Sequence, residues 1–510
     1  MVNSTVYLPD GQSFTVVPVF AGLQFKSNDL NAHHSAYPVG WTVVLHTEDD
    51  LKSEGEETDA KNSEKPHVHS FRKPTLQGDS LFISSVSNPS SSDFKPATSP
   101  TRQTAMMLWV SLYWYFQQQA PDVLLPATAA SNGTPVPGRP RGEWRIRIKR
   151  EGMLRVRNLI PKLERMGLIA TLESSAISAG TKGEDGWDSM FVTRSMFWQI
   201  PPQLFLFTLQ PTKGGAASGG IGGTSSFPGS PNASRPSSPL PAGVVINDGE
   251  SAKATSLAAV QSFPIGPFFS TSHLPTYYPP GPLRYTMTGN VRHPARPKPP
   301  RMGEVFYTRF VPSVNQYLSL RVASLSSQAV PYMGPKGPQP PIAETAALTA
   351  LSDTGLMQKW MASPRVSKFW GNWEDDFLVT ALSSQHSFPV IAMWDGVPFG
   401  YFEIYWVKED ILGVMVGAQA ADDFDRGLHV FIGEEWARGR VQQWLSSVVQ
   451  YILSSDNRTM GVCIEPRVDN TRFIQLLETG GFNKQREVTF KHKQSWFGRL
   501  DRDGWQGPAL

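Results

Sequence analysis

Residues 386–410 read HSFPVIAMWDGVPFGYFEIYWVKED, residues 425–445 read DRGLHVFIGEEWARGRVQQWL, and these two stretches decide the fold. Apolar side chains alternate from Phe388 to Trp394, Asp395-Gly396 follow, and an apolar, aromatic run extends from Phe399 to Val407. Two such runs around an Asp-Gly pair are typical of a β-hairpin, because Asp-Gly fits the tight turn between antiparallel strands. We therefore predict two buried strands joined by this turn.

The second stretch predicts a third strand that begins at Asp425 and leads into a loop. Its apolar residues end at Ile432, Gly433-Glu434-Glu435 follow, and an amphipathic helix is expected from Val441 to Leu453. The first backbone amides of a helix have no partner within that helix, so a helix that starts soon after a strand can bind an anion. This strand, loop and helix could hold a pyrophosphate, but the same arrangement occurs in many folds.

Length and composition favour a protein of more than one domain that does not bind nucleic acid. A chain of 510 residues exceeds what one hydrophobic core usually serves. The net charge is +3, and the basic residues are dispersed rather than gathered on one face. The single cysteine, Cys463, excludes an internal disulfide and a thiolate metal cluster, which favours a reducing compartment.

The sequence gives no indication of secretion or of a membrane span. No apolar run reaches the roughly 18 residues that a membrane helix needs, and the first residues lack a basic-then-apolar signal. The last residues, GPAL, are not a peroxisomal SKL-type signal. We therefore expect a cytoplasmic protein, with a peroxisomal location as the alternative.

Segments rich in Gly, Ser and Pro divide the chain. Residues 48–66 are acidic and polar and residues 86–103 are rich in Ser and Pro, so both are expected to be solvated loops. Lys213–Ala242 has too little apolar area to order itself and is predicted to be a disordered insertion. Residues 263–300 are rich in Pro, Tyr and Phe, and we expect an extended segment that packs on a neighbouring surface.

The first half, residues 1–210, is expected to contain strands near its start and helices at Thr104–Gln118 and Met153–Gly167. Aromatic residues recur at helical spacing in the first of these helices, which is typical of a helix packed in a core. The second helix is basic and would also suit a DNA-binding role. Glu151 and Glu164 lie among its basic residues and no second basic face exists, which disfavours that interpretation.

Six segments of the C-terminal region carry a resemblance to a known family. They are GEVFYTRFVPS (303–313), SPRVSKFWGNW (363–373), GVPFGYFEIYWVKED (396–410), DRGLHVFIGEEWARGR (425–440), CIEPRVDNTRFIQLLETGGF (463–482) and EVTFKHKQSWF (487–497). In this order they resemble the GNAT acyltransferase domain of siderophore biosynthesis, which bacterial aerobactin and mycobactin acyltransferases share with fungal hydroxyornithine acyltransferases. Residues 142–169 and 189–211 are similar to the fungal members.

The resemblance implies an α/β (α+β) GNAT fold. It combines a C-terminal acyl-CoA acyltransferase domain with a degenerate GNAT-like N-terminal half that completes the substrate cleft. The expected domains are the N-terminal half at 1–210, a Gly/Ser/Pro-rich insertion and extended connector at 211–300, the acyltransferase domain at 301–500, and a tail at 501–510.

The resemblance places acyl-CoA along the third predicted strand and the loop that follows it. Val430 and Ile432 on the strand are expected to contact acyl-CoA, and Arg438, Gly439 and Arg440 are expected at its pyrophosphate. The loop departs from the usual GNAT signature Q/R-x-x-G-x-G/A, since it ends in Arg-Gly-Arg rather than with two small residues. This departure leaves open which backbone amides hold the pyrophosphate.

Acyl transfer from a thioester to an amine needs a neutral nitrogen, a group that accepts its proton, and donors that stabilise the oxyanion. His386 stands just before the first strand of the hairpin and Asp425 begins the third strand, so we expect the two to lie close together. The resemblance implies that they are the catalytic pair. The alternatives are a polar residue at a strand start for His386 and a turn held by its side chain for Asp425.

The remaining candidate residues belong to the hairpin and to a later helix. Glu403, Tyr405, Trp406 and Asp410 are predicted to hold the cationic amino-acid part of hydroxyornithine, with Tyr405 and Trp406 equally suited to a core. Asn470 opens a predicted helix and is expected either to contact the pantetheine arm or to cap that helix.

These features predict an enzyme, an acyl-CoA-dependent N-acyltransferase. We expect it to acetylate the hydroxylated side-chain nitrogen of hydroxyornithine and so to form the hydroxamate of a ferricrocin-type siderophore. An anhydromevalonyl-CoA transferase of extracellular siderophore synthesis is the alternative, and the missing SKL-type tail favours the acetyl enzyme. From other classes, a catalytically inactive GNAT-like scaffold and an N-terminal protein acetyltransferase remain open.

No permanently bound cofactor is expected, and acetyl-CoA or another acyl-CoA would be a co-substrate. No metal site is expected either, because His, Cys and carboxylate residues do not cluster at ligand spacing. The expected partners are acyl-CoA and hydroxyornithine, without nucleic acid or membrane. The sequence leaves open whether the protein forms a homo-oligomer.

Overall fold

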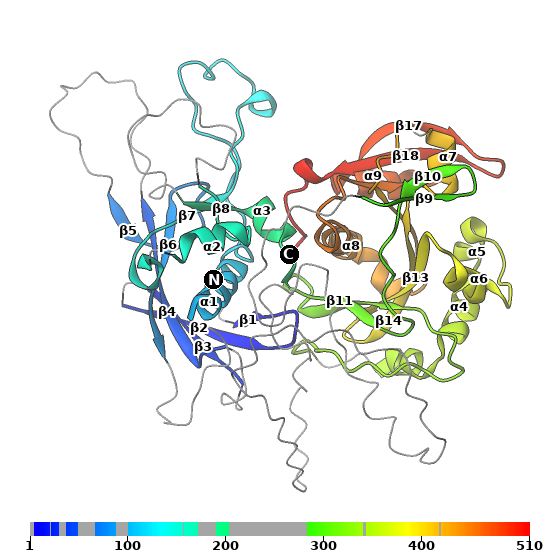
Figure 1. Ribbon diagram of the computed structural model, residues 1–510, viewed down its shortest axis with the longest axis horizontal. Coiled ribbons are helices and arrows are strands. Elements are labelled where there is room, and N and C mark those ends of the chain that lie inside the picture. The colour runs from blue at the N-terminus through cyan, green and yellow to red at the C-terminus, as the bar shows by residue number, and fades with distance from the viewer. Residues whose placement is uncertain are drawn as a thin grey trace, which may run out of the picture.

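The computed structural model describes residues 5–20, 22–29, 37–48, 67–87, 100–156, 158–171, 190–202, 283–339, 343–417 and 420–510. It contains two eight-stranded sheets, one from each half of the chain, which lie side by side (Figure 1). The predicted insertion Lys213–Ala242 and residues 263–282 of the predicted extended segment lie outside the described residues. The domain boundaries therefore stay a prediction.

The N-terminal sheet has the strand order β1-β2-β3-β4-β6-β7-β8, with β5 paired to β4. Its strands are β1 (Thr5–Tyr7), β2 (Ser13–Val19), β3 (Gly22–Ser27), β4 (Gly40–Glu48), β5 (Val68–Ser70), β6 (Asp79–Ser87), β7 (Arg145–Ile148) and β8 (Phe191–Thr193). Its helices are α1 (Pro100–Tyr115), α2 (Ile160–Arg165) and α3 (Arg194–Gln199), with 3-10 turns η2 (Val136–Gly138) and η3 (Gly152–Arg155). Among the described strands of this sheet, β6 and β7 form the parallel pair, and α1 connects them.

The predicted core helix is confirmed as α1, which is buried from Thr104 to its end. Trp41 on β4 donates from its indole nitrogen to the Ser111 hydroxyl of α1 at 3.0 Å and stacks on Phe25 of β3. The second predicted helix, Met153–Gly167, is wrong in extent. Pro161 suits the first turn of a helix but breaks a longer one, so α2 starts only at Ile160.

The C-terminal sheet has the order β11-β12-β13-β14-β15-β16-β18-β17. Its strands are β11 (Val305–Val311), β12 (Gln316–Val322), β13 (Ser387–Trp394), β14 (Val397–Trp406), β15 (Arg426–Ile432), β16 (Gly461–Ile464), β17 (Asn483–Thr489) and β18 (Gln494–Asp501). The helices are α4 (Asp353–Met361), α5 (Pro364–Trp370), α6 (Phe377–Ser383), α7 (Ile411–Val416), α8 (Val441–Ser455) and α9 (Thr471–Thr479), with 3-10 turns η7 (Ala343–Ala350), η8 (Glu435–Arg440) and η9 (Arg502–Gly504). A separate hairpin is formed by β9 (Tyr285–Thr288) and β10 (Val291–Pro294).

The predicted hairpin is confirmed as β13 and β14. Asp395 and Gly396 have φ of 48° and 84°, and positive φ at both positions is what the tight hairpin turn requires. The Asp395 carboxylate also accepts from the Tyr317 amide at 2.8 Å. The third strand starts at Arg426, one residue later than expected.

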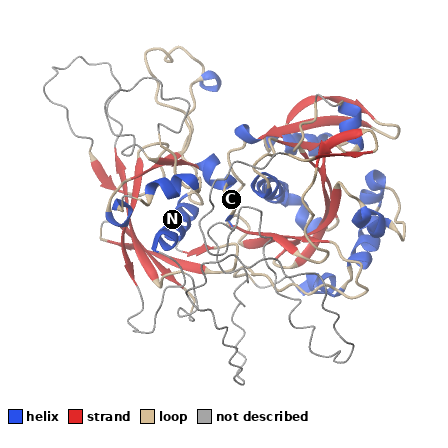
Figure 2. Cartoon of the chain, viewed as in Figure 1, coloured by secondary structure: helices blue, strands red, loops and turns tan. Residues whose placement is uncertain are grey.

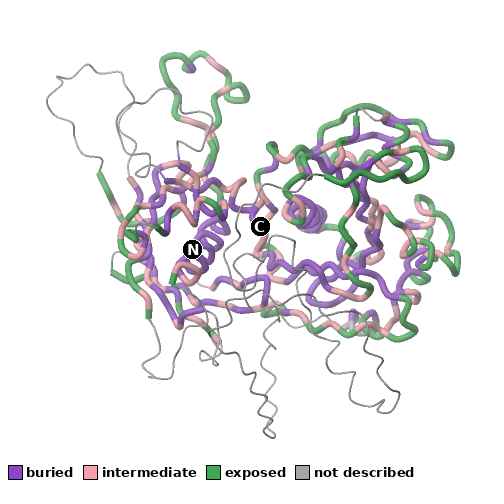
Figure 3. Tube along the Cα trace, in the orientation of Figure 1, coloured by how far each residue is buried: buried purple, intermediate pink, exposed green. Residues whose placement is uncertain are grey.

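Helices cover both faces of the C-terminal sheet (Figure 2). Trp444 and other residues of α8 pack on the face that carries Phe402 and Leu428, while α4, α5 and α6 pack on the face that carries Tyr401 and Phe431. The one parallel pair among the described strands of this sheet is β15 and β16, and α8 connects them. Buried residues accordingly run along α8 and the strands beneath it (Figure 3).

The two halves meet at α8 and at the end of the chain. Gln450 of α8 donates from its side-chain nitrogen to the carbonyl of Trp198 at 3.2 Å, and Arg502 donates to the Gln199 side chain at 2.9 Å. The tail packs between the halves, since Arg194 donates to the Pro508 carbonyl at 3.1 Å. The N-terminal half therefore supports the helix that follows β15. No helix in the described part of the chain is long and apolar enough to cross a membrane.

Candidate active site

The backbone of the C-terminal sheet opens between β15 and β16. Their parallel ladder consists of the pairs Arg426–Val462 and Gly427–Cys463, although β15 continues to Ile432. From Leu428 onward, β15 pairs only with β14 among the described strands. An extended ligand can bind such a free strand edge by main-chain hydrogen bonds. We call the space between the diverging strands the wedge.

A histidine held between two carboxylates lies at the wedge. His429 on β15 lies directly across from Glu403 on β14, and its Nδ1 is 3.1 Å from Glu403 Oε2. Its Nε2 is 2.9 Å from Oε1 of Glu465, the residue that follows β16. The second hydrogen bond therefore spans the wedge, and three neighbouring strands bring the three side chains together.

Further donors hold the carboxylates of this cluster. Tyr405 donates to Glu465 Oε2 at 2.9 Å, Lys493 Nζ lies 3.2 Å from Glu465 Oε1, and Tyr401 donates to Glu403 Oε1 at 2.8 Å. The exposed fractions of the side chains are 4% for Glu465, 19% for Glu403 and 27% for His429. Glu465 is thus the buried anchor, and Glu403 and His429 form the accessible side of the cluster.

The cluster sets the charges of its members. Burial alone would raise the pKa of Glu465, but His429, Lys493 and Tyr405 together lower it to about 2. Burial alone would lower the pKa of His429, but Glu465 and Glu403 raise it well above its ordinary value. At neutral pH His429 is therefore an imidazolium that donates to both carboxylates.

The structure does not bring the predicted catalytic pair together. His386 Nε2 lies 3.2 Å from Asp410 Oδ2, and Asp425 is bound by Arg499 and accepts from the Asp422 amide at 3.1 Å. β14 lies between β13 and β15 in the sheet, so the strand starts next to His386 and Asp425 are separated by two strand spacings, roughly 9–10 Å. The expected proximity is therefore wrong, and the catalytic roles of the two residues stay a prediction.

Asp425 has the contacts of a structural residue. Its side chain is buried, and burial raises its pKa to about 6 although Arg499 acts in the opposite direction. The hydrogen bond to the Asp422 amide closes the turn before β15. The sequence alternative placed a turn at Asp425-Arg426-Gly427, and that position is wrong because Arg426 and Gly427 already belong to β15. The Asp425 side chain does hold a turn, but the turn lies before the strand.

Only one of the predicted hydroxyornithine contacts, Glu403, belongs to the cluster. Tyr405 is fully buried and its hydroxyl is used by Glu465. Trp406 is buried, with the guanidinium groups of Arg426 and Arg296 at 4.0 and 4.3 Å from its ring centroid. Both residues are thus buried, which agrees with the core alternative, and the predicted contact of each with the substrate stays a prediction.

Asp410 contacts other parts of the fold, and its predicted contact with hydroxyornithine stays a prediction. Its Oδ1 accepts from the Leu412 amide at 2.8 Å, which caps the N-terminus of α7, and its Oδ2 contacts His386. Asp410 is buried, so both carboxylate oxygens are used inside the fold. The short polar-capped helix α7 explains why an aspartate stands at this position.

The predicted acyl-CoA residues follow the wedge. Val430 and Ile432 lie on the part of β15 that has left β16. A Cβ added to Gly439 would meet nothing within 4 Å, so open space borders the loop there. Arg438 is half exposed, with its guanidinium 3.2 Å from Glu435. The helical backbone starts earlier than expected, because η8 runs directly into α8.

The Arg440 side chain contacts other side chains of the fold, whereas the Asn470 side chain makes no hydrogen bond to the helix that follows it. The Arg440 guanidinium donates to the Gln316 side chain at 2.5 Å and lies 5.2 and 5.4 Å from the ring centroids of Trp394 and Trp436. These contacts hold the guanidinium against the fold, and its predicted contact with the pyrophosphate stays a prediction. Asn470 precedes α9, and its side chain makes no capping hydrogen bond there. The capping alternative for Asn470 is thus wrong.

His429, Glu465 and Lys493 were missed by the sequence interpretation. The motif DRGLHVFI contains His429 within an otherwise apolar strand, and a polar residue in a buried strand is a signal for function. The partner Glu403 was predicted, but for a different role. Glu465 follows β16 and reaches His429 across a parallel pair, which no local pattern reveals.

The N-terminal half repeats the connections of the C-terminal half but not its wedge. β6 and β7 pair only at Ser80–Arg147 and Leu81–Ile148, and η3 fills the space beyond this ladder. Gly152 of η3 has φ of +54°, and a Cβ there would lie 2.2 Å from the Ile83 carbonyl oxygen. The chain itself therefore occupies the position at which the C-terminal half is open.

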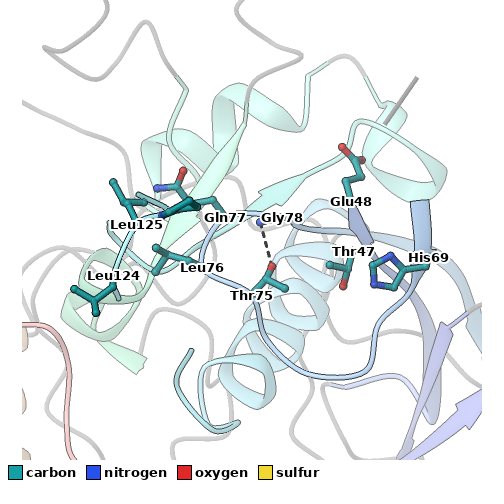
Figure 4. Close-up of a pocket in the computed structure, with 10 residues that line it drawn as sticks. Thr47, Glu48, His69, Thr75, Leu76, Gln77, Gly78, Leu124 and Leu125 are labelled. Carbon is teal, nitrogen blue, oxygen red and sulfur yellow. Dashed lines mark hydrogen bonds between the residues drawn. The ribbon is translucent and has the colours of Figure 1, made fainter. Parts of the chain in front are cut away.

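A cavity of about 340 Å³ lies elsewhere in the N-terminal half (Figure 4). It is bordered by the ends of β4 and β5 and by two loops, and Gly78 donates there to the Thr75 hydroxyl at 3.1 Å. The carboxylate in its lining, Glu48, is paired with Arg147 and Lys149 at 2.7 and 2.9 Å. The cavity is remote in the fold from the wedge and has no part in the site.

Comparison with known proteins assigns the class of this fold and site. Residues 349–490 match the family model described as an acetyltransferase (GNAT) domain. These residues include β13 to β17, the wedge, and the cluster of Glu403, His429 and Glu465. The C-terminal half is thus a GNAT domain, as the resemblance predicted, and GNAT acetyltransferases use acyl-CoA.

Whole-chain comparison narrows this assignment. The chain is 51% identical to the N5-hydroxyornithine acetylase sidL of Beauveria bassiana (strain ARSEF 2860), over 97% of this chain and 100% of that protein. The chain therefore belongs to the family of this acetylase. Its identity is 34% to the N(5)-hydroxyornithine:cis-anhydromevalonyl coenzyme A-N(5)-transacylase SIDF of the same fungus, over 41% and 42% of the two chains. It is also 34% identical to the N(6)-hydroxylysine O-acetyltransferase of Escherichia coli, over 44% and 63%.

Proposed function

We propose that this protein transfers the acetyl group of acetyl-CoA to the hydroxylated side-chain nitrogen of hydroxyornithine. The product is a hydroxamate, which would serve a siderophore of the ferricrocin type. The observation that carries the proposal is the match to a hydroxyornithine acetylase over nearly the whole chain, whereas the anhydromevalonyl transferase of the same organism matches less than half of it. That difference favours acetyl over anhydromevalonyl as the acyl group.

The proposed chemistry assigns separate proton transfers to Glu403 and His429. The nitrogen of a hydroxylamine is weakly basic and largely neutral near pH 7, so it can attack the thioester carbonyl without prior deprotonation. As the C–N bond forms, Glu403 accepts the proton of the nitrogen. Once it is protonated, Glu403 no longer needs to accept from the Nδ1–H of His429, so this Nδ1–H donates its proton to the sulfur of CoA as the C–S bond breaks. A proton then passes from Glu403 to His429 along their 3.1 Å hydrogen bond and restores both groups.

In this proposal Glu465 and Lys493 are positioning residues. Glu465 holds His429 in its charged form and fixes its ring through Nε2. Lys493 offsets the second carboxylate charge, so the two carboxylates and the two cations of the cluster balance. His386 and Asp425 are kept as the competing proposal for the catalytic pair, and the same assays test both.

The acetylation itself is the first prediction. Purified protein mixed with acetyl-CoA and N5-hydroxyornithine is expected to release thiol and to form a product that gives the ferric hydroxamate colour. The value of kcat/KM should be at least about tenfold higher for acetyl-CoA than for anhydromevalonyl-CoA, because differences in acyl size in a packed site change rates by this order. An absence of hydroxamate would favour the inactive scaffold, and acylated peptides would favour a protein acetyltransferase.

The second prediction separates the two loop arginines. Arg438→Ala is expected to raise the KM for acetyl-CoA roughly threefold to tenfold, because it removes a charged hydrogen bond to phosphate. The effect stays moderate because Arg438 is half exposed and solvent weakens such a bond. Arg440→Ala should instead lower thermal stability and change this KM less, since its guanidinium is bound within the fold. The KM for hydroxyornithine serves as the control. A larger effect of Arg440→Ala on the KM for acetyl-CoA would reverse the assignment.

We also propose a cytoplasmic location, with acetyl-CoA and hydroxyornithine as co-substrates and no permanently bound cofactor. Support for the co-substrate comes from the GNAT family, and support for the acceptor comes from the hydroxyornithine acetylase. Fractionation of cells that express the tagged full chain checks the location, with a peroxisomal signal as the contradicting result.

A further inference from the structure

Aromatic side chains cover the sheet beside His429. Trp370 ends α5, Phe377 begins α6, and Tyr401 and Phe431 lie on β14 and β15. The contacting rings are arranged edge to face, tilted or stacked, with ring centroids 5.1 to 6.5 Å apart. We call these four side chains the aromatic wall. Contacts of this density leave little room for other atoms.

Trp370 limits the space in front of His429. The ring centroids of the two residues are 6.4 Å apart and their planes cross at 84°. Glu403 and Glu465 flank His429 from the two neighbouring strands. The ring centroids of Tyr405 and His429 are 4.4 Å apart. A group that extends from His429 away from the sheet therefore meets the Trp370 ring.

The helix that carries Trp370 is fixed to the loop after β15. Arg365 of α5 donates to the Gly433 carbonyl at 2.5 Å and pairs with Glu435. On the preceding helix, α4, Lys359 and Trp360 both donate to Glu434, at 2.6 and 2.8 Å. These bonds connect α5 to the loop proposed to hold acyl-CoA, so Trp370 has a defined position when a thioester enters the wedge.

We propose that Trp370 determines the acyl specificity of the enzyme by blocking the space that an acyl chain longer than acetyl would need. This inference rests on the proposed function, because it assumes that a thioester reacts next to His429. An acetyl group has one carbon beyond the carbonyl, whereas propionyl and butyryl groups extend further toward the wall. Additional methylene groups cannot enter a close-packed site without displacing the indole ring.

The test measures kcat/KM for acetyl-CoA, propionyl-CoA and butyryl-CoA with hydroxyornithine in the full-length protein. In Trp370→Ala the ratio of butyryl-CoA to acetyl-CoA should rise by about tenfold or more, and in Trp370→Phe by about threefold, because pocket contacts discriminate single methylene groups by such factors. Trp373→Ala is the matched control. Trp373 contacts Phe377 at 6.1 Å between centroids and donates to Asp375, and no described contact joins it to His429.

An unchanged ratio in a folded Trp370→Ala protein would overturn the proposal, and so would an equal rise in Trp373→Ala. Trp370→Phe decides the question if the alanine variant does not fold. Dissociation constants of the three acyl-CoAs, measured by calorimetry without acceptor, separate this proposal from the proposed function. If the wild type fails to acylate hydroxyornithine but Trp370→Ala still binds butyryl-CoA relatively more tightly, the specificity role stands while the acceptor is wrong. If neither kcat/KM nor binding changes with acyl length, the role of Trp370 is wrong.

Discussion

Replacing His429 with alanine is expected to lower turnover by a factor on the order of 10² to 10⁴, the range in which a positioned acid or base contributes. His429 lies at the wedge, is partly accessible, and is charged at neutral pH because two carboxylates flank it. Without it, the leaving thiolate loses its proton donor, and Glu403 keeps the hydrogen bond from Tyr401 but loses the one from His429. The KM for acetyl-CoA should change little, since the contacts proposed for CoA are made by Val430, Ile432 and the loop after β15 rather than by the His429 side chain.

The comparison with His386→Ala decides between the two proposed catalytic groups. If His386 and Asp425 are the catalytic pair, His386→Ala should show the large loss of turnover instead of His429→Ala. Adding Asp425→Asn to His386→Ala should then lower turnover no further. If the cluster at the wedge is the catalytic group, His386→Ala should keep most of its activity. Thermal unfolding of each variant excludes misfolding as the cause, and His429→Gln is the more conservative substitution should His429→Ala unfold.

Local chemistry made part of the fold predictable. The turn at Asp395-Gly396 defined the hairpin from sequence alone, because a tight turn that needs positive φ at both positions leaves few other choices. The motifs also identified the GNAT domain, which the comparison confirms. The predicted helix Met153–Gly167 was too long, because the prediction followed the periodic pattern of apolar residues and gave too little weight to Pro161.

Side-chain contacts across the sheet were less predictable. The prediction that joined His386 and Asp425 used the proximity of strand ends and overlooked β14 between them. The connection from β14 to β15 contains α7 rather than a tight turn, so the register that pairs Glu403 with His429 could not be counted from the sequence. Glu465 reaches His429 only because β15 and β16 diverge, which is a property of the folded sheet.

Glu465→Gln should produce the largest loss of stability among the variants considered. It leaves the partly exposed cations of His429 and Lys493 near a neutral amide. Removing one partner of a buried ion pair costs roughly 3–5 kcal/mol in the free energy of unfolding, and the partial exposure of the two cations places the expected loss at the lower end of this range. The folded-state pKa of Glu465 lies below its ordinary value of 4.5, at about 2. The stabilisation is therefore present above pH 4.5 and is lost as pH falls toward 2. Chemical denaturation of wild type and variant should show their stabilities converging over this range.

The same substitution should shift the alkaline limb of the pH-rate profile. In the proposed mechanism His429 acts as an acid, so activity falls as pH rises through its raised pKa. Glu465→Gln removes the negative charge that contributes most to raising that pKa, so the alkaline limb should move to lower pH. Lys493→Met is the control with the opposite sign, because it removes a neighbouring positive charge. The alkaline limb of this variant should move to higher pH. A Glu465→Gln profile that coincides with the wild type would show that His429 does not titrate in the reaction.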